Sequence, residues 1–542
     1  MLNNKQIAGQ FDLLAKLMEL HDDNPFKIKT YANAYLSLRK LEGDLAAMPT
    51  SELAAIKGVG QSVAEKVKEL VATGQMKALN QWKEKTPAGI IQMLSIKGLG
   101  PKKVKQIWKE MEILTIGELL YACNENRLVH YSGFGLKLQA EIKEKLEYYQ
   151  ASEGKYLYAH VHQHADQCLA ELRKMYPNAK LEIVGDIRRC MPEVKGIEIL
   201  SNQKITIEGD HILAVDGAMT YQGFPLFIFE IEDAHFNHEF FKRSCSDVFF
   251  QDVSEKADIN LTEKEIFFTL GVNFMPPEYR EDPTDLSKYK DKEYPLIDLK
   301  DIQGIVHNHS DYSDGLHTLT EMARYVHQSG YKYFVISDHS KSAGYASGLS
   351  VEKVLAQWSE IDLINATFDD GFKILKSIES DILTDGSLDY TDDILKGFDL
   401  VIASIHSGLQ MDEAKATNRL IKAIENPYTN ILGHPTSRLL LARPGYPVDY
   451  HKIIDACAAN HVAIELNANP QRLDLDWTWI PYAMKKSVYV AINPDAHSKE
   501  SIHYVKYGVA AARKGGLTKE MCINTWSLNQ FEDWISIKKG RN

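Results

Sequence analysis

Apolar positions divide the chain into a helical front and a back in which strands alternate with helices. Over residues 1–150, apolar residues recur every three or four positions, as at Ile7, Phe11 and Leu14, and short turns with Gly or Pro separate the segments. From Leu181 to Phe250, apolar and β-branched runs favour strands instead. We therefore expect an all-α region first and a region of mixed α+β structure after it.

Beyond Asp301, strand-like runs alternate with helical segments, and each run ends in polar side chains. Alternating strands and helices favour a parallel sheet, and in a barrel of such units the loops that follow the strands meet at one rim. We expect an α/β barrel of seven such units with one reactive rim. The side chains at the ends of the runs are His307, His309, Asp338, His339, Glu379, His406, His434, Asn467, Asp495 and His497.

Length and composition fit a folded protein of several domains. The chain has 542 residues, and at about 150 residues per domain this predicts three or four domains. Hydrophobic residues make up 44% and charged residues 25%, which excludes collagenous and wholly disordered classes. No stretch reaches the roughly 20 apolar residues of a membrane-spanning helix, and the first residues lack a signal-peptide pattern, so we expect a cytoplasmic protein. Six scattered cysteines without a CxxC pair indicate reduced thiols.

Charge is distributed unevenly along the chain. The net charge of −12 argues against a nucleic-acid partner, because phosphate binding needs a basic surface. Residues 1–150, however, contain 21 Lys and Arg against 17 Asp and Glu, and the remaining residues contain 41 against 57. The front is mildly basic, and the acidic surplus of the back indicates solvated surface or carboxylates gathered for metal ions.

Three turns in the helical region share one pattern of Gly, apolar residue and Gly before a helix. Such a turn exposes backbone N–H groups at a helix start, where hydrogen bonds and the helix dipole favour a phosphate. One copy would indicate an ordinary helix-connecting turn, whereas three copies followed by lysines predict binding to the DNA backbone. The residues are Gly58, Gly60, Gly98, Gly100, Gly133 and Gly135, followed by Lys66, Lys102, Lys103 and Lys137.

The first turn also carries a family resemblance. The run Gly58–Gly74, preceded by Asn24–Tyr31, resembles the small amino-terminal domain of DNA polymerase beta and its bacterial relatives, and the second turn resembles their fingers hairpin. The resemblance implies that Lys66 holds the position of a Schiff-base lysine and Lys27 that of a 5′-phosphate contact. Ser62 stands where the family has a lysine, so a solvated or phosphate-contacting Lys66 is the alternative to lyase chemistry.

The segment Val184–Leu200 is similar to the nucleotide-binding motif and catalytic strand of the same polymerases. Nucleotidyl transfer uses two divalent ions held by carboxylates, and an Asp-x-Asp pair on a strand places both carboxylates on one face. Here Gly196 and Glu198 hold the two aspartate positions, and Asp186 holds that of a phosphate-binding serine. The residues of this degenerate polymerase site are Asp186, Arg188, Arg189, Gly196 and Glu198.

Few carboxylates remain near this motif to hold two magnesium ions. The family's third carboxylate position falls at about Phe227, and Glu230 and Glu232 are the substitutes that one strand face offers. Because each Mg²⁺ draws on several oxygens, we expect a palm and thumb that keep the polymerase fold without polymerase activity. An active gap-filling polymerase that also has 3′–5′ exonuclease activity is the alternative.

The rim residues of the carboxy-terminal region include many metal ligands. A single histidine is more often a surface or core residue, but imidazoles and carboxylates gathered at one rim suit zinc, manganese or iron. Nine ligands exceed the needs of one tetrahedral ion and predict a centre of two or three divalent ions. They are His307, His309, Asp314, His339, Glu379, His406, His434, Asp495 and His497.

These motifs resemble the polymerase and histidinol phosphatase (PHP) domain of bacterial X-family polymerases, from residue 301 to the end of the chain. The match includes Glu379–Tyr390, Gly433–Arg438 and Glu465–Asp474. The resemblance implies one ion on His307, His309, Glu379 and Asp495, a second on Glu379, His406 and His434, and a third on Asp314, His339 and His497.

The implied chemistry is phosphoester hydrolysis by metal-activated water, with Glu379, His309 and Asp495 at its centre. No protein nucleophile is required. Arg438, Arg472 and Lys341 are phosphate contacts or, alternatively, surface charges.

We interpret the chain as an X-family DNA polymerase homologue with metal-dependent 3′–5′ exonuclease activity in DNA repair. A phosphatase of small phosphate esters and a non-catalytic DNA-end binding protein are the rivals. The expected partner is gapped, nicked or 3′-ended DNA, without a membrane, and the expected state is a monomer. The expected domains are 1–80 (small helical domain), 81–150 (fingers-like region), 151–230 (palm), 231–282 (thumb), 283–300 (linker) and 301–542 (PHP domain).

Overall fold

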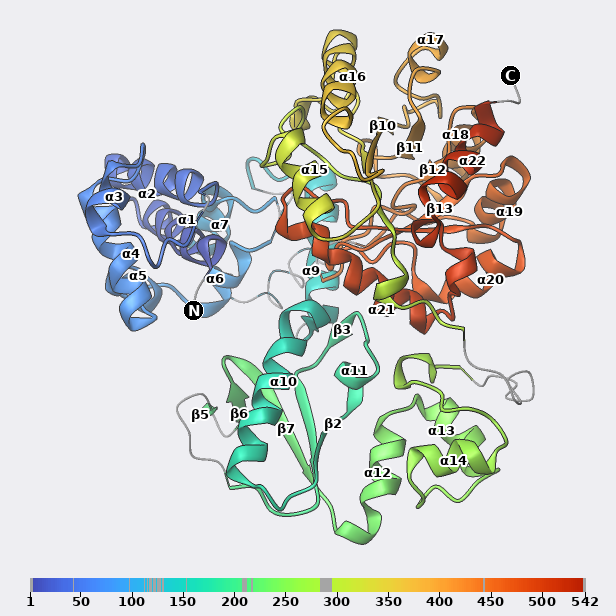
Figure 1. The fold of residues 1–542 in the computed structure, drawn as a ribbon. Coiled ribbons are helices and arrows are strands. Elements are labelled where there is room, and N and C mark those ends of the chain that lie inside the picture. Colours follow the sequence, from blue (N-terminus) through green and yellow to red (C-terminus); the bar gives the residue numbers. More distant parts are fainter. Residues whose placement is uncertain are drawn as a thin grey trace. The chain divides into compact units, whose positions relative to one another are not determined.

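The computed structural model describes residues 3–282 and 295–539, except residues 42, 97, 153, 207–211, 216–217, 442–443 and most of 112–130. Most of the expected linker therefore lies outside the described residues. The chain forms two compact units, Met1–Glu153 and Gly154–Asn542 (Figure 1). No helix in the described ranges is long and apolar enough to cross a membrane.

The first unit is helical, as the apolar spacing predicts. Ile7, Phe11 and Leu14 are fully buried on α1, and they anchor a core that collects one apolar face from each following helix. Asn3 and Gln6 form a capping box that starts α1. The helices are α1 (Asn4–Leu20), α2 (Pro25–Leu38), α3 (Thr50–Ala55), α4 (Gln61–Thr73), α5 (Lys77–Glu84), α6 (Ala88–Met93), α7 (Pro101–Lys109) and α9 (Leu136–Ser152).

The second unit begins with a small mixed sheet of order β2-β4-β7-β6-β5, in which β4 and β7 run parallel and the other neighbours antiparallel. The helix α10 (Tyr158–Met175) packs on this sheet through Val161 and Leu172, and the short α11 (Gly185–Arg188) follows β2. The strands are β2 (Leu181–Ile183), β4 (Ile197–Ser201), β5 (Ile212–Val215), β6 (Ala218–Tyr221) and β7 (Phe224–Glu230); β1 (Tyr156–Leu157) pairs with β3 (Glu193–Val194).

Strand structure ends earlier than the apolar runs predict. From Phe236 onward the chain forms α12 (Phe236–Arg243), α13 (Asp247–Ser254) and α14 (Glu263–Thr269). Ser246 caps the start of α13, and Phe241, Phe249 and Phe267 meet in a separate small core. The prediction of strands up to residue 250 is wrong here because these aromatic residues pack at helical spacing. The apolar runs in this segment are too short to distinguish the periodicity of a helix from that of a strand.

The rest of the second unit is a seven-stranded parallel sheet whose strands follow chain order, as predicted. Asn308 and Ala496 form an isolated parallel bridge between the two edges, so the sheet is nearly closed into a barrel. The strands are β8 (Gly304–Ile305), β9 (Tyr333–Ile336), β10 (Lys373–Asp381), β11 (Leu400–Ser404), β12 (Ile431–Leu432), β13 (Ala463–Asn467) and β14 (Val490–Asn493).

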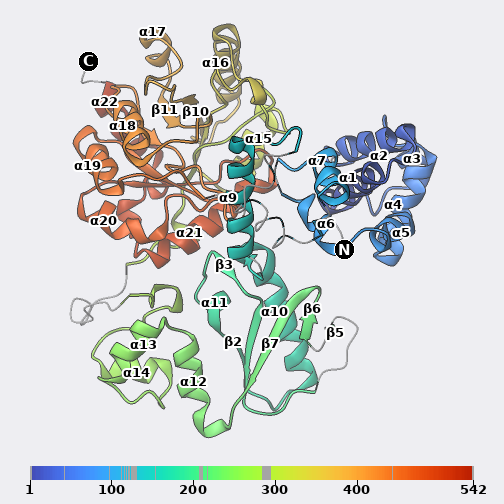
Figure 2. The same ribbon diagram turned by 180° about the vertical axis from the view of Figure 1, so that it is seen from behind.

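Helices surround this barrel in both views (Figures 1 and 2). Nearly every strand residue is buried, as expected for a parallel sheet covered by helices on its outer face. Val335, Ile402 and Ala491 belong to an inner core that Phe531 of α22 completes. The helices are α15 (Leu319–Gln328), α16 (Val351–Asn365), α17 (Asp392–Leu395), α18 (Glu413–Ile424), α19 (Tyr450–Asn460), α20 (Ile480–Lys485), α21 (Val505–Lys514) and α22 (Leu528–Lys539).

Candidate metal centre

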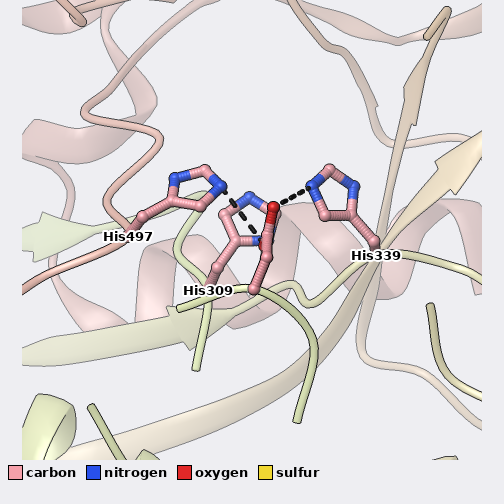
Figure 3. Close-up of side chains that lie close together, drawn as sticks. His309, His339 and His497 are labelled. Carbon is pink, nitrogen blue, oxygen red and sulfur yellow. Dashed lines mark ion pairs between the residues drawn. The ribbon is translucent and has the colours of Figure 1, made fainter. Parts of the chain in front are cut away.

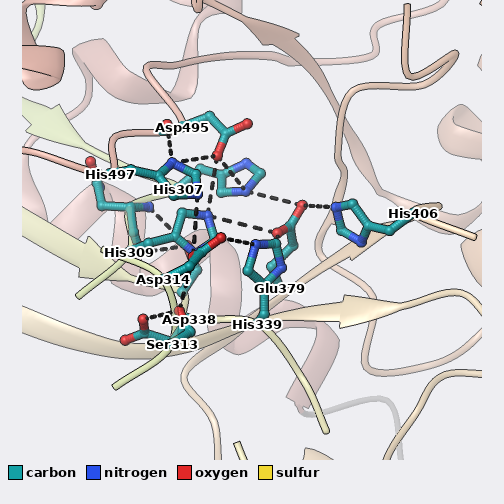
Figure 4. A network of polar contacts seen from close by, with 12 residues as sticks. His307, His309, Ser313, Asp314, Asp338, His339, Glu379, His406, Asp495 and His497 are labelled. Carbon is teal, nitrogen blue, oxygen red and sulfur yellow. Dashed lines mark hydrogen bonds and ion pairs between the residues drawn. The ribbon is translucent and has the colours of Figure 1, made fainter. Parts of the chain in front are cut away.

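All nine predicted ligands lie at the carboxyl ends of the barrel strands. The chain leaves each parallel strand at the same rim, so residues far apart in sequence meet there. His307 and His309 follow β8, Glu379 lies within β10, and Asp495 follows β14. Figure 4 shows these side chains converging with Asp314, His339, His406 and His497.

The carboxylate of Glu379 lies at the centre of this group. It is fully buried, and imidazoles approach both of its oxygens. Oε1 lies 3.2 Å from Nε2 of His307, 3.2 Å from Nε2 of His406 and 2.9 Å from Nε2 of His434. Oε2 lies 2.9 Å from Nδ1 of His339. Imidazoles thus surround this one buried carboxylate.

Asp314 gathers a second set of imidazoles. Its Oδ1 lies 3.3 Å from Nε2 of His497 and 3.9 Å from Nδ1 of His309, and its Oδ2 lies 3.5 Å from Nε2 of His339. Figure 3 shows the rings of His309, His339 and His497 lying close together. Asp495 adds a third point of contact, with Oδ1 3.1 Å from Nε2 of His309.

Within the described part of the chain, three clusters offer ligand atoms that all lie within 4.8 Å of one another. They are His309, Asp314, His339 and His497; His307, His309 and Asp495; and His339, Glu379 and His406. These clusters could hold metal ions. His434 completes the sequence-predicted set through its contact with Glu379.

Buried polar atoms in the described centre fit a cation. Nε2 of His307, Nδ1 of His309 and Oε2 of Glu379 are buried and make no hydrogen bond. Unsatisfied buried polar atoms are rare in folded proteins, and each of these atoms belongs to a side chain in one of the three clusters. The donor set of imidazoles and carboxylates suits zinc, manganese or iron.

Protonation states favour the same interpretation. Burial, aided by His497 and His339, lowers the pKa of His309 to about 3, which leaves its imidazole neutral and able to bind a cation. Burial alone would raise the pKa of Glu379, but His406, His307 and His339 hold it well below its usual value. Burial alone would lower the pKa of His339, but Glu379 and Asp314 outweigh that effect and raise the pKa to about 10 in the metal-free protein.

Two buried carboxylates that sequence reasoning missed orient the ligands. Glu465 in the middle of β13 accepts a hydrogen bond from Nδ1 of His307 at 2.6 Å, which turns Nε2 of that ring toward Glu379. Asp381 contacts Nδ1 of His406 in the same way. Such partners fix the ring orientation of a ligating histidine. Both residues stand in the motifs that carried the PHP resemblance, which was the available signal.

Asp338 does not join the ligand set. Its carboxylate accepts hydrogen bonds from the amide of Ser310 at 2.8 Å, the hydroxyl of Ser310 at 2.7 Å and Nε2 of Gln357 at 2.6 Å. The side chain of Ser313 also contacts it. These contacts occupy both oxygens, so Asp338 shapes the loop after β8 instead of facing a cation.

The predicted phosphate contacts have different environments. Arg438 donates to the carbonyl oxygen of Arg472 at 2.9 Å and to Asp476 at 2.6 Å, which commits its guanidinium to the surrounding loop and argues against a phosphate contact. Arg472 lies beside the centre, with Nε 3.6 Å from Oδ2 of Asp495. Its buried Nη1 makes no hydrogen bond within the described chain, so it remains the better prediction. Lys341 is exposed near the ring of Tyr390.

The three Gly-containing turns share a positive φ at the first glycine and open space at the second. Their first glycines, Gly58, Gly98 and Gly133, have φ of +90°, +100° and +86°, which L-residues with side chains rarely adopt. A Cβ atom at the second glycine of each turn would meet nothing within 4 Å. The backbone there is open to a ligand. Those second glycines are Gly60, Gly100 and Gly135.

Of the two lysines of the first turn region, Lys27 is exposed and Lys66 is half-buried. Lys66 lies on α4 and donates to the hydroxyl of Ser62 at 3.0 Å, and Lys27 lies on α2. Lys102 follows the second turn at the start of α7. These positions suit phosphate contacts, and lyase chemistry at Lys66 stays a prediction.

Glu198 does not present its carboxylate as a metal ligand would. It is folded back to accept from the amide of Asp186 at 3.1 Å, where it caps the start of α11. Burial, with Asp186 nearby, raises its pKa. Its strand neighbour in β7 is Phe227, as the alignment of the third carboxylate position predicts. The carboxylate therefore occupies the backbone turn of the nucleotide-binding motif.

Neither substitute carboxylate can join Glu198. Glu230 pairs with Ser201, three residues along β4, so it points to the opposite face of the sheet. Glu232 lies beyond the end of β7 and is exposed. The expectation that the two share a strand face with the degenerate site is wrong, because the strand ends at Glu230 and the register places that residue on the other side.

A nearly closed parallel barrel with a rim of imidazoles and carboxylates, joined to helix-hairpin-helix turns, defines a metal-dependent phosphoesterase with DNA-binding elements. Family models agree at two places: "Helix-hairpin-helix domain" matches residues 2–76, and "SAM-like Helix-hairpin-helix tandem" matches residues 90–147. The DNA polymerase/3′-5′ exonuclease PolX of Bacillus subtilis (strain 168) is 31% identical over 98% of this chain and 99% of its own length. The chain belongs to this family of bacterial X-family DNA polymerases with a PHP domain.

Relatives of the barrel alone are phosphatases by name. A probable phosphatase of Thermoanaerobacter sp. (strain X514) is 28% identical over 41% of this chain and 89% of its own length, and a probable phosphatase YcdX of Escherichia coli O81 (strain ED1a) is 31% identical over 28% and 57%. A crystal structure of histidinol phosphate phosphatase from Lactococcus lactis covers 40% of this chain and 94% of its own, at 18% identity and a TM-score of 0.31. The strand order β8 to β14 by itself defines the barrel.

Proposed function

We propose that the chain is a metal-dependent 3′–5′ exonuclease that acts on DNA ends during repair, with a palm that does not transfer nucleotides. The observation that carries this proposal is the buried carboxylate of Glu379 surrounded by imidazoles, together with Asp314 and Asp495 at the same rim. The helix-hairpin-helix turns favour DNA as the substrate. The domain ranges expected from the sequence form part of this proposal.

Bound divalent ions, with manganese, zinc or iron as the candidates, would supply an activated water and stabilise charge on the attacked phosphate. Neutral His309 and ionised Glu379 would hold these ions, with Glu379 between the site of His307 and that of His406. Arg472 would contact the phosphate beside Asp495. The chain itself supplies no nucleophile in this scheme.

Two observations support an inactive palm. An Asp side chain at Gly196 would place its Cβ 2.5 Å from the backbone oxygen of Pro225, so the missing aspartate position has no room for a side chain. Glu198 is engaged with the turn at Asp186, and Phe227 stands beside it. A magnesium pair lacks the oxygens that it needs there.

The decisive assay is degradation of 3′-recessed, gapped and abasic DNA with Mn²⁺ by the full chain. We expect His307→Ala to lose on the order of a thousandfold or more in rate, because it removes a ligand from the reacting ions. His327→Ala is the matched control, since His327 pairs with Asp370 on the barrel surface. Equal activity of His307→Ala and wild type would discard the centre.

Two further readouts separate the alternatives. Primer extension on gapped DNA with Mg²⁺ or Mn²⁺ tests the palm, and robust incorporation that Glu198→Ala abolishes would contradict its inactivity. Hydrolysis of small phosphate esters at rates exceeding those on DNA would favour a phosphatase. DNA binding without hydrolysis under any metal would favour an end-binding protein.

A further inference from the structure

Arg189 of the palm motif is engaged by a glutamate that follows the thumb helices. Its Nε donates to Oε1 of Glu281 at 2.9 Å, and its Nη2 contacts the other oxygen, which gives a two-point pair. Both side chains are largely buried. A two-point arginine–carboxylate pair is the strongest and most directional ion pair that side chains form. The guanidinium is thereby withdrawn from any nucleotide phosphate.

A lysine from the barrel completes the same contact. Nζ of Lys514, the last residue of α21, donates to Oε1 of Glu281 at 2.8 Å and to the carbonyl oxygen of Arg189 at 2.9 Å. The side chain of Lys514 is fully buried. Burial alone would raise the pKa of Glu281, but Arg189 and Lys514 hold it below its usual value, so the glutamate is charged between two cations.

The neighbouring arginine is bound in a parallel way. Arg188 contacts Glu263 at the start of α14 at 2.6 Å, and the other oxygen of Glu263 contacts the buried Arg280. Arg280 in turn donates to the carbonyl oxygen of Met275 at 2.9 Å. Both arginines of the palm motif therefore form ion pairs with carboxylates of the thumb.

A second ion pair supports the connection to the barrel. Arg513 contacts Glu278 at 2.7 Å and donates to the carbonyl oxygen of Ile297 at 2.7 Å. Adjacent residues of α21 thus contact the segment that contains Glu278 and Glu281. Exposed ion pairs add little to stability, whereas removal of one partner from a buried pair leaves an uncompensated charge.

We propose that Arg189, Glu281 and Lys514 form an interdomain joint that holds palm, thumb and barrel as one body, and that Arg188 with Glu263 locks the thumb beside it. In this chain the arginines of the former nucleotide-binding motif serve structure in place of triphosphate binding. The joint gives both arginines a role that does not require nucleotide binding. It does not depend on the reaction that the barrel catalyses.

Hydrogen exchange of the full-length protein tests the joint. We expect Arg189→Met and Lys514→Met each to speed amide exchange in α13, α14 and α21 on the order of 100-fold, since each leaves buried Glu281 short of a partner. Arg173→Met is the matched control, because Arg173 pairs with an exposed Glu182 on the same palm. The triple variant Arg189→Met, Glu281→Met and Lys514→Met should exchange no faster than the single Arg189→Met variant, because it removes all three charges of the joint and buries none of them unpaired.

Wild-type exchange rates in the thumb and α21 of both single variants would overturn the proposal. Binding of a magnesium nucleoside triphosphate to the wild-type palm, lost in Arg189→Met, would overturn it as well. If Arg189→Met fails to fold, the milder Lys514→Met variant, which leaves the palm motif intact, decides the outcome by itself.

Discussion

The substitution Glu465→Gln isolates the effect of one buried carboxylate on the metal centre. Oε1 of Glu465 accepts from Nδ1 of His307 at 2.6 Å and from Nδ2 of Asn493 at 2.7 Å, and Oε2 accepts from the amide of His434 at 2.7 Å. Glutamine has the same shape, but its NH₂ group must replace one of these oxygens. Whichever oxygen is replaced, at least one buried donor then faces another donor.

The expected losses follow from these contacts. Each buried donor left without an acceptor costs about 1–3 kcal/mol of folding stability. Loss of the carboxylate that orients a ligating histidine reduces metal affinity by about 10- to 100-fold, which is about 1.4–2.7 kcal/mol of binding free energy. We therefore expect Glu465→Gln to unfold at lower temperature and to bind Mn²⁺ or Zn²⁺ more weakly.

Metal titration by calorimetry and thermal unfolding with and without metal measure both effects. Glu532→Gln is the control, because Glu532 forms a partly exposed ion pair with Lys373 and should change neither quantity. Unchanged metal affinity in Glu465→Gln, with the expected loss of stability, would refute an orienting role and leave Glu465 a purely structural residue.

Three further predictions concern the first Gly-containing turn, the palm strand and the pH dependence of stabilisation by metal. Gly60→Leu, in an extended conformation with open space around it, should cost less than about 1 kcal/mol of stability yet lower DNA affinity by blocking the turn. Gly58→Leu, at positive φ, should instead destabilise the fold. The double change Gly196→Asp with Glu198→Asp should restore no primer extension. The folded-state pKa of His339 is about 10, above its ordinary 6.5. In the metal-free protein, the stability that comes from the bound proton is complete below pH 6.5 and is lost as pH rises toward about 10. Since the proton competes with a metal ion, the increase in unfolding temperature given by Mn²⁺ should be larger at pH about 8 than at pH about 6.

The nine predicted ligands could be placed at one rim from the sequence because their position depends only on the residues next to them in the chain. Each ligand follows a short buried run, and parallel strands deliver such residues to one edge whatever the details of packing. His307 and His497 are far apart in sequence, yet both could be placed at that edge. The same reasoning could not distinguish Asp338 from a ligand, because its hydrogen bonds to Ser310 and Gln357 depend on loop and helix positions.

The sequence by itself determined the helical front, the order of the barrel strands and the gathering of the nine predicted metal ligands at one rim. Only the tertiary structure decided what the remaining charged groups do. Long-range contacts join Arg189 to Glu281 and Lys514, turn Glu465 onto His307 and fold Glu198 onto its own motif. Periodicity reports which side chains are buried, whereas the partner of a buried charge depends on which distant segments pack together.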